Sequence, residues 1–230
     1  MVKIPFSVYD FFAILSSGAV VLMTVDYVWG LGILERKEVG PVLGIALVML
    51  AYVTGHIVAH FSSFLFEYII VARILKRPLA LLLGEKPRWL VFVWIFPNFH
   101  RPFPENTQTR IREQATARGC TAEGEGLFLH AYSIMSANER LQSRLDDFRT
   151  QYGFARNMSF AFLVSAIAIA AAHFHGAHPV RLRWSLLAAF AAISLFYRYL
   201  KFLHQYSYEL FLRYAESPRS TSLDGASYGQ

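Results

Sequence analysis

The chain has 230 residues, of which 55% are hydrophobic and only 17% are charged, and its formal net charge is +6. Soluble domains average about a quarter charged residues, so this composition excludes an ordinary soluble domain and indicates a membrane protein. The single cysteine, Cys120, excludes an intrachain disulfide.

The chain begins with two apolar runs that are each long enough to cross a bilayer, which takes about 20 residues. The first span is predicted at 11–33, and it is longer than the core of a cleavable signal peptide, which has about 7 to 15 residues. The second span is predicted at 41–62. No glycine or proline follows it until Pro78, so its helix is expected to continue to Lys76.

Residues 78–156 are expected to form a cytoplasmic or interfacial helical region. The apolar run at 89–96 is too short to cross a bilayer. With two tryptophans and flanking charges, it predicts an interfacial or protein-packed segment. A short polar helix is predicted at 105–118 and is ended by Gly119. Another helix is predicted to begin near Gly126 and to run without a break into the third span.

Two further spans are predicted at 157–175 and 182–201, and the second is expected to continue as a helix to about Tyr214. Small residues recur on both spans at helical spacing, which indicates close packing, either in an internal hairpin or between subunits. The tail, 217–230, is rich in serine and glycine and is expected to be disordered.

The predicted fold class is therefore an all-α polytopic membrane protein with four transmembrane helices extended into a cytoplasmic helical bundle. We expect the chain to divide into regions at 1–77, 78–156, 157–216 and 217–230. Basic residues are dense between Arg73 and Arg156 and sparse in the short loops. Since cytoplasmic loops carry the excess of lysine and arginine, this pattern predicts a multi-pass protein of the cell inner membrane with both termini cytoplasmic.

Polar residues form one stripe along the second helix. His56, His60, Ser63 and Glu67 fall within an arc of roughly 60°, because offsets of four, seven and eleven residues return close to the starting direction of a helix. Ionisable groups at membrane depth usually face protein or water, so the stripe is a candidate pore lining or polar track from the membrane to the cytoplasm.

The first span brings two further hydroxyls to this stripe. Antiparallel pairing across the short loop relates residues whose numbers sum to roughly 75, which places Ser16 and Ser17 beside His56 and His60. In the structural interpretation, the serines satisfy the imidazole nitrogens across the helices. In the functional interpretations, the cluster lines a pathway or forms the nucleophile and base of an intramembrane hydrolase.

Asp26 is the acidic residue inside the first predicted span and joins the candidate polar track. One interpretation buries it against another helix, a water cavity or a neighbouring subunit. The other ends the span near Val25 and places Asp26 at the interface.

Arginines give the expected cytoplasmic helices a basic face that includes Arg110, Arg112, Arg140, Arg144 and Arg149. Such a face attracts anionic lipid headgroups, and it can also bind an acidic nucleotide or oligonucleotide through bidentate contacts to phosphate. Interleaved acidic residues favour a third interpretation, a solvated and salt-bridged surface.

The sequence predicts no catalytic residue, metal or cofactor. His173, His175 and His178 are more typical of a solvated loop than of a metal site, because no fixed carboxylate or thiolate lies nearby. No glutamate follows His56 as the zinc-protease motif requires.

The whole-chain pattern of short-looped spans, extended helices and a basic inner face resembles the small membrane effectors of bacterial anti-phage systems, such as the Hailong-type effector. The segments Tyr9–Phe12 and Gly55–Glu67 also look like those of uncharacterised bacterial membrane proteins. The resemblance implies an oligomeric channel that a nucleic-acid oligomer made by a partner enzyme holds in check. It implies no residue roles.

The leading interpretation is a homo-oligomeric ion channel or membrane-perturbing effector in the lipid bilayer, gated through its cytoplasmic region. The alternatives are an intramembrane hydrolase or metal-dependent enzyme that uses Ser16 or Ser17 with His56 and His60, and a membrane scaffold that docks a soluble partner protein.

Overall fold

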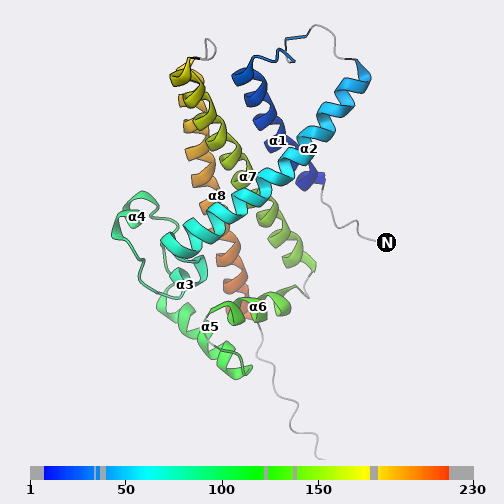
Figure 1. Ribbon diagram of the computed structural model, residues 1–230. Coiled ribbons are helices and arrows are strands. Elements are labelled where there is room, and N and C mark those ends of the chain that lie inside the picture. The colour runs from blue at the N-terminus through cyan, green and yellow to red at the C-terminus, as the bar shows by residue number, and fades with distance from the viewer. Residues whose placement is uncertain are drawn as a thin grey trace, which may run out of the picture. The chain divides into compact units, whose positions relative to one another are not determined.

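The computed structural model describes residues 8–33, 35–36, 40–121, 124–136, 139–176 and 181–217. Every regular element in these ranges is a helix, and four helices are long and apolar enough to cross a membrane, which confirms the predicted all-α polytopic fold (Figure 1). The chain divides into two compact units. Unit 1 comprises the described residues up to Leu75 together with Asp147–Leu203, and unit 2 comprises Lys76–Asp146 and the described residues from His204.

In unit 1, α1 (Val8–Trp29) and α2 (Pro41–Ser62) pack through two glycines. A Cβ on Gly18 would lie 1.8 Å from the Ala51 carbonyl oxygen, and one on Gly55 would lie 2.0 Å from the Ile14 carbonyl oxygen. The two backbones therefore touch, and only glycine permits this approach. This contact sets Gly18 against Ala51 and Gly55, whereas the predicted register places it against Ile57.

The helix continues past α2 as η1 (Ser63–Leu75), so the predicted extension is confirmed. The winding differs from the expectation, because η1 is a π-helix of 13 residues, a form that usually occupies a single turn. Lys76 ends the helix in a left-handed conformation with φ of 72°. Pro78 then begins the short helix α3 (Pro78–Leu82), which the sequence analysis did not predict.

The helices α7 (Glu139–His175) and α8 (Leu182–Glu216) form the second membrane hairpin, and the predicted extension of the fourth span is confirmed. Serines join the two helices. Ser159 Oγ donates to the Ala192 carbonyl oxygen and Ser185 Oγ to that of Ala166, both at 2.8 Å. Ser185 and Ala192 of the small-residue face on α8 therefore pack against α7 within the chain, one of the two uses left open by the sequence, whereas Ser165 of the small-residue face on α7 bonds to Thr24 of α1.

A pair of hydroxyl groups is among the contacts that connect the two hairpins of unit 1. Thr24 Oγ1 of α1 donates to Ser165 Oγ of α7 at 2.7 Å. Aromatic packing adds a core around the buried side chain of Phe66, whose ring centroid lies 5.0 Å from that of Phe196 on α8.

Unit 2 contains α3, α4 (Leu90–Ile95), α5 (Glu105–Ala117) and α6 (Gly124–Met135), with the first residues of α7 and the last of α8. The helix predicted from Gly126 into the third span is wrong as one element: α6 ends at Met135 and α7 begins at Glu139. The apolar periodicity continues across this break, which concealed it. Of the tail predicted to be disordered, only Ser217 is among the described residues.

Buried apolar side chains form the core of unit 2. Ile111 of α5, Leu127 of α6 and Phe211 of α8 have no exposed surface. Phe103 N–H donates to the Leu82 carbonyl oxygen at 3.0 Å, which fixes the chain before α5 against α3.

Candidate functional site

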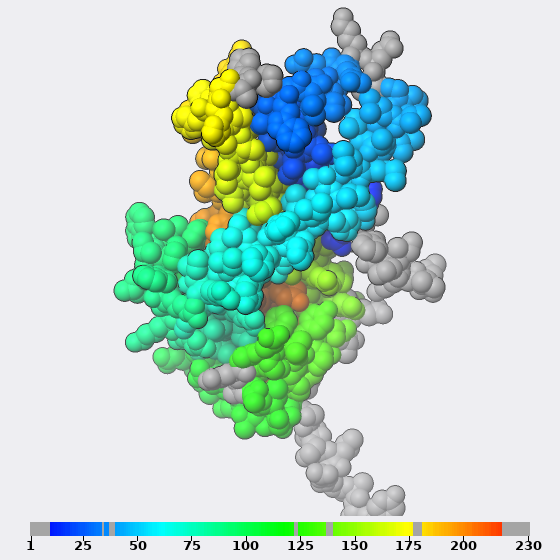
Figure 2. Space-filling view, in the orientation of Figure 1, coloured from blue at the N-terminus to red at the C-terminus, as the bar shows by residue number. Residues whose placement is uncertain are grey.

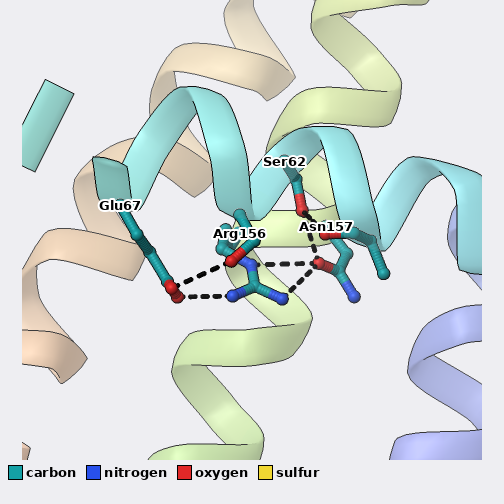
Figure 3. A network of polar contacts seen from close by, with 6 residues as sticks. Ser62, Glu67, Arg156 and Asn157 are labelled. Carbon is teal, nitrogen blue, oxygen red and sulfur yellow. Dashed lines mark hydrogen bonds and ion pairs between the residues drawn. The ribbon is translucent and has the colours of Figure 1, made fainter. Parts of the chain in front are cut away.

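Arg156 of α7 is the centre of a polar network in unit 1 (Figure 3). Its guanidinium forms an ion pair with Glu67 of η1. Its Nε and Nη2 each donate to Asn157 Oδ1 at 3.1 Å. Ser62 Oγ donates to the same Asn157 oxygen at 2.8 Å, and Ser63 Oγ donates to Glu67 Oε2 at 2.9 Å.

This network is largely shielded from solvent. Ser62 is fully buried and Asn157 is 5% exposed, while the side chains of Arg156 and Glu67 are 15% and 39% exposed. A charge removed from water is tolerated only when it is paired and hydrogen-bonded. Glu67 and Asn157 supply these partners to Arg156, so the network ties η1 to α7 at the point where α2 ends.

The predicted stripe on α2 and η1 divides into two parts. Ser63 and Glu67 belong to the network. His56 and His60 are exposed on α2, and the His56 ring packs against Tyr52 with a centroid distance of 4.6 Å. Figure 2 shows α2 lying on the surface of the chain along the visible face, in blue to cyan. The two histidines are therefore not covered by the described part of their own chain.

Ser16 and Ser17 bond within their own helix. Ser16 Oγ donates to the Phe12 carbonyl oxygen at 2.6 Å, and Ser17 Oγ donates to that of Ile14 at 2.9 Å. Among the described residues, no hydrogen bond joins either serine to His56 or His60. Within the described residues, these serines and histidines therefore do not form the nucleophile and base pair that the hydrolase interpretation requires.

Asp26 lies in the last turn of α1, which ends at Trp29, between the end at residue 33 and the alternative end near Val25 that the sequence predicts. The residue is 8% exposed, and its Oδ1 accepts a hydrogen bond from Ile33 N–H at 2.8 Å. An acidic residue at a helix C-terminus opposes the helix dipole, so this bond to the following loop offsets an unfavourable position. Asp26 therefore shapes the chain after α1 and does not join the network around Arg156.

A cavity of about 430 Å³ in unit 2 brings together part of the predicted basic face. Glu209 forms ion pairs with two arginines: its Oε1 lies 3.3 Å from Arg144 Nη1 and 3.4 Å from Arg213 Nε. Arg213 also pairs with Glu216 at 3.2 Å. Three arginines against two glutamates leave the lining one positive charge in excess; the full lining is Met135, Arg140, Leu141, Arg144, Glu209, Arg213, Glu216 and Ser217.

The other predicted arginines lie elsewhere. Arg110 and Arg112 are on α5 and do not line this cavity, and Arg112 Nη2 donates to the Leu83 carbonyl oxygen at 3.0 Å. Arg149 belongs to unit 1. The arginines predicted as one face are thus divided between two units, and of these predicted arginines only Arg140 and Arg144 line the cavity.

Metal binding gains no support from the described residues, which contain no group of three or more histidine, cysteine, aspartate or glutamate side chains suited to a metal ion. His173 and His175 are exposed at the end of α7. The third histidine of the predicted run, His178, lies outside the described residues.

Sequence reasoning missed the partners that complete the network. Arg156 is counted among the basic residues that set orientation and form the basic face, and Asn157 is the first residue of the span predicted at 157–175. An adjacent Arg-Asn pair at the start of a span, with a glutamate just beyond another span, is the signal that could have indicated the contact.

Comparison of the chain with protein-family models, with curated proteins and with solved structures gave no match.

Proposed function

We propose that this chain is the subunit of a homo-oligomeric ion channel or membrane-perturbing effector of the cell inner membrane, in which α2 faces the conducting path. The observation that carries this proposal is the exposure of His56 and His60 on a helix long and apolar enough to cross a membrane. Such side chains at membrane depth require protein or water beside them. Since their own chain leaves them exposed, a second subunit or a water-filled path fulfils this requirement.

Control through the region after η1 is the second part of the proposal. The sequence places that region and both termini in the cytoplasm by its basic residues. Arg140, Arg144 and Arg213 around the unit 2 cavity are groups that bind phosphate, so an acidic nucleotide or oligonucleotide is the proposed ligand. Together with the resemblance to anti-phage membrane effectors, this supports a role in antiviral defence.

The alternatives have less support. A hydrolase needs Ser16 or Ser17 activated by histidine, and both hydroxyls donate to backbone carbonyls of α1. A scaffold that docks a soluble partner requires no polar group on the exposed face of α2.

Ion flux from reconstituted liposomes tests the proposal. We expect the purified oligomer to release entrapped ions, and we expect His56→Ala/His60→Ala to change the rate or the ion selectivity by about tenfold, because the polar lining is lost. Val53→Ala/Ile57→Ala is the matched control, since these residues are apolar and exposed on the same helix. Absence of flux under every ligand condition, or equal effects of the two double variants, would contradict the proposal and favour the scaffold.

A further inference from the structure

The helix α4 and the tryptophan before it present a group of exposed apolar side chains. No residue of α4 is buried. Trp89, Leu90 and Trp94 are 62%, 82% and 85% exposed, and Val91 and Ile95 are also exposed. In Figure 1, α4 projects away from α3 and α5 of the same unit. An apolar patch of this kind on a folded chain marks an interaction site.

The length and composition of this segment fit the boundary between lipid headgroups and acyl chains. The helix α4 has six residues, far fewer than the about 20 that cross a bilayer. Tryptophan favours the membrane interface because its ring is apolar and its N–H requires a polar partner. Trp89 and Trp94 lie near the two ends of the apolar run, so both ends favour the membrane interface.

Basic residues flank the apolar run. Lys86 and Arg88 precede it and Arg101 follows it, and all three are exposed. The stretch from Lys86 to Arg101 contains no acidic residue, so its formal net charge is +3. Anionic headgroups attract basic side chains near the surface by about 1 kcal/mol each, which favours lipid over an apolar protein surface as the occupant.

The chain on both sides of α4 is fixed to the core of unit 2. Leu81 and Leu82 of α3 are buried before it, and Phe99 and Phe103 are buried after it. The ring of Phe99 lies 6.3 Å from that of His204 on α8. A segment held at both ends in this way transmits its attachment to the unit that holds it.

We infer that residues 86–96 form a shallow membrane anchor that binds unit 2 to the lipid surface. The apolar side chains of α4 enter the headgroup boundary, and Lys86 and Arg88 contact anionic headgroups. The inference is independent of ion conduction, because it rests on the exposure and flanking charges of α4 alone.

Tryptophan quenching in the full chain tests the anchor. In the double variant Trp29→Phe/Trp184→Phe, all tryptophan fluorescence comes from Trp89 and Trp94. In phosphatidylcholine and phosphatidylglycerol vesicles, we expect blue-shifted emission that lipids brominated near the headgroup reduce by about half, and more strongly than lipids brominated at the bilayer centre. The reciprocal variant, Trp89→Phe/Trp94→Phe, reports Trp29 and Trp184 and controls for incorporation of the protein.

The remaining outcomes separate the possible occupants. Red-shifted emission that acrylamide quenches and brominated lipid does not would overturn the inference, because α4 would face water. Blue-shifted emission without lipid quenching would also overturn it and would indicate a second copy of the chain. The charged flank is tested by Lys86→Gln/Arg88→Gln: we expect it to remove the excess quenching seen in phosphatidylglycerol over pure phosphatidylcholine, and an unchanged excess would assign the binding to apolar contact only.

Discussion

Arg156 shows how one side chain can connect three parts of unit 1. Its guanidinium contacts Glu67 on η1 and the neighbouring residue Asn157. The side-chain oxygen of Asn157 also accepts a hydrogen bond from Ser62 at the end of α2. Removing one member of a shielded pair leaves the other charge without its partner, and this loss usually exceeds the net contribution of the pair. Glu67 is the more exposed member of the pair, so water partly solvates its carboxylate when Arg156 is removed.

The Glu67–Arg156 coupling can be measured by a double-mutant cycle. We expect Glu67→Gln and Arg156→Gln each to lower the free energy of unfolding in detergent, with a coupling of about 1 to 2 kcal/mol between them. A second cycle with Lys76→Gln and Glu85→Gln is the control, because the side chains of this pair are more exposed, at 25% and 54%, and their coupling should be less than about 0.5 kcal/mol. A coupling no larger than that of the control pair would contradict the role given to the network.

The glycine contact gives a second prediction at the level of single residues. Gly18→Ala should destabilise the protein by about 1 to 3 kcal/mol, because its methyl group would meet the Ala51 backbone and force α1 from α2. Gly153→Ala is the matched control: nothing lies within 4 Å of its added Cβ, so it should stabilise α7 by about 0.5 to 1 kcal/mol. Thermal unfolding in one detergent compares the two. Equal effects would argue against the close backbone contact.

At the scale of elements, hydrophobic length alone was enough to predict the four spans, and capping by Pro78 and Gly119 was enough to place two helix ends. The register of α1 and α2 was not predictable from loop length, because the contact of Gly18 with Gly55 sets it. The break between α6 and α7 was not predictable for a different reason: apolar spacing continues across it, and no glycine or proline marks it. The network around Arg156 joins residues distant in sequence, which periodicity cannot relate.

The serine bonds of the α7–α8 hairpin give a prediction at this scale. Ser159→Ala should lower the free energy of unfolding by about 0.6 to 2 kcal/mol, since it removes a buried hydroxyl donor to the Ala192 carbonyl between two membrane helices. Ser194→Ala, at an exposed position of α8, should have no measurable effect. Denaturation followed by tryptophan fluorescence measures both, and a neutral Ser159→Ala would show that small-residue packing suffices to hold the hairpin.

At the scale of the whole molecule, the proposed oligomer places the exposed face of α2 near a neighbouring subunit. Only 17% of the most apolar window of the second membrane helix is buried in the single chain, which is the smallest fraction among the four candidate spans. A subunit interface or a water path on this face accounts for the histidines, while bilayer lipid accounts only for the apolar residues.

Disulfide trapping tests this arrangement. In a Cys120→Ser background, His56→Cys should form covalent dimers in membranes on oxidation, because neighbouring copies of α2 lie close together. Ala51→Cys is the control, since Ala51 is buried against α1 within its own subunit. Dimer formation is read from a non-reducing gel. Equal trapping at both positions, or none at His56→Cys, would contradict an oligomer built on this face.

The serine and threonine bonds described above also bear on biosynthesis. The Ser159 and Ser185 bonds join helices adjacent in the chain, as does the Gly18–Gly55 contact, so each hairpin holds together as soon as its two helices enter the bilayer. The Thr24–Ser165 bond and the Arg156 network join the early hairpin to the late one. We therefore expect Glu67 to keep its hydrogen bond from Ser63 and to lack its arginine until α7 has been synthesised, so that the early hairpin gains its last charged partner only from the late one.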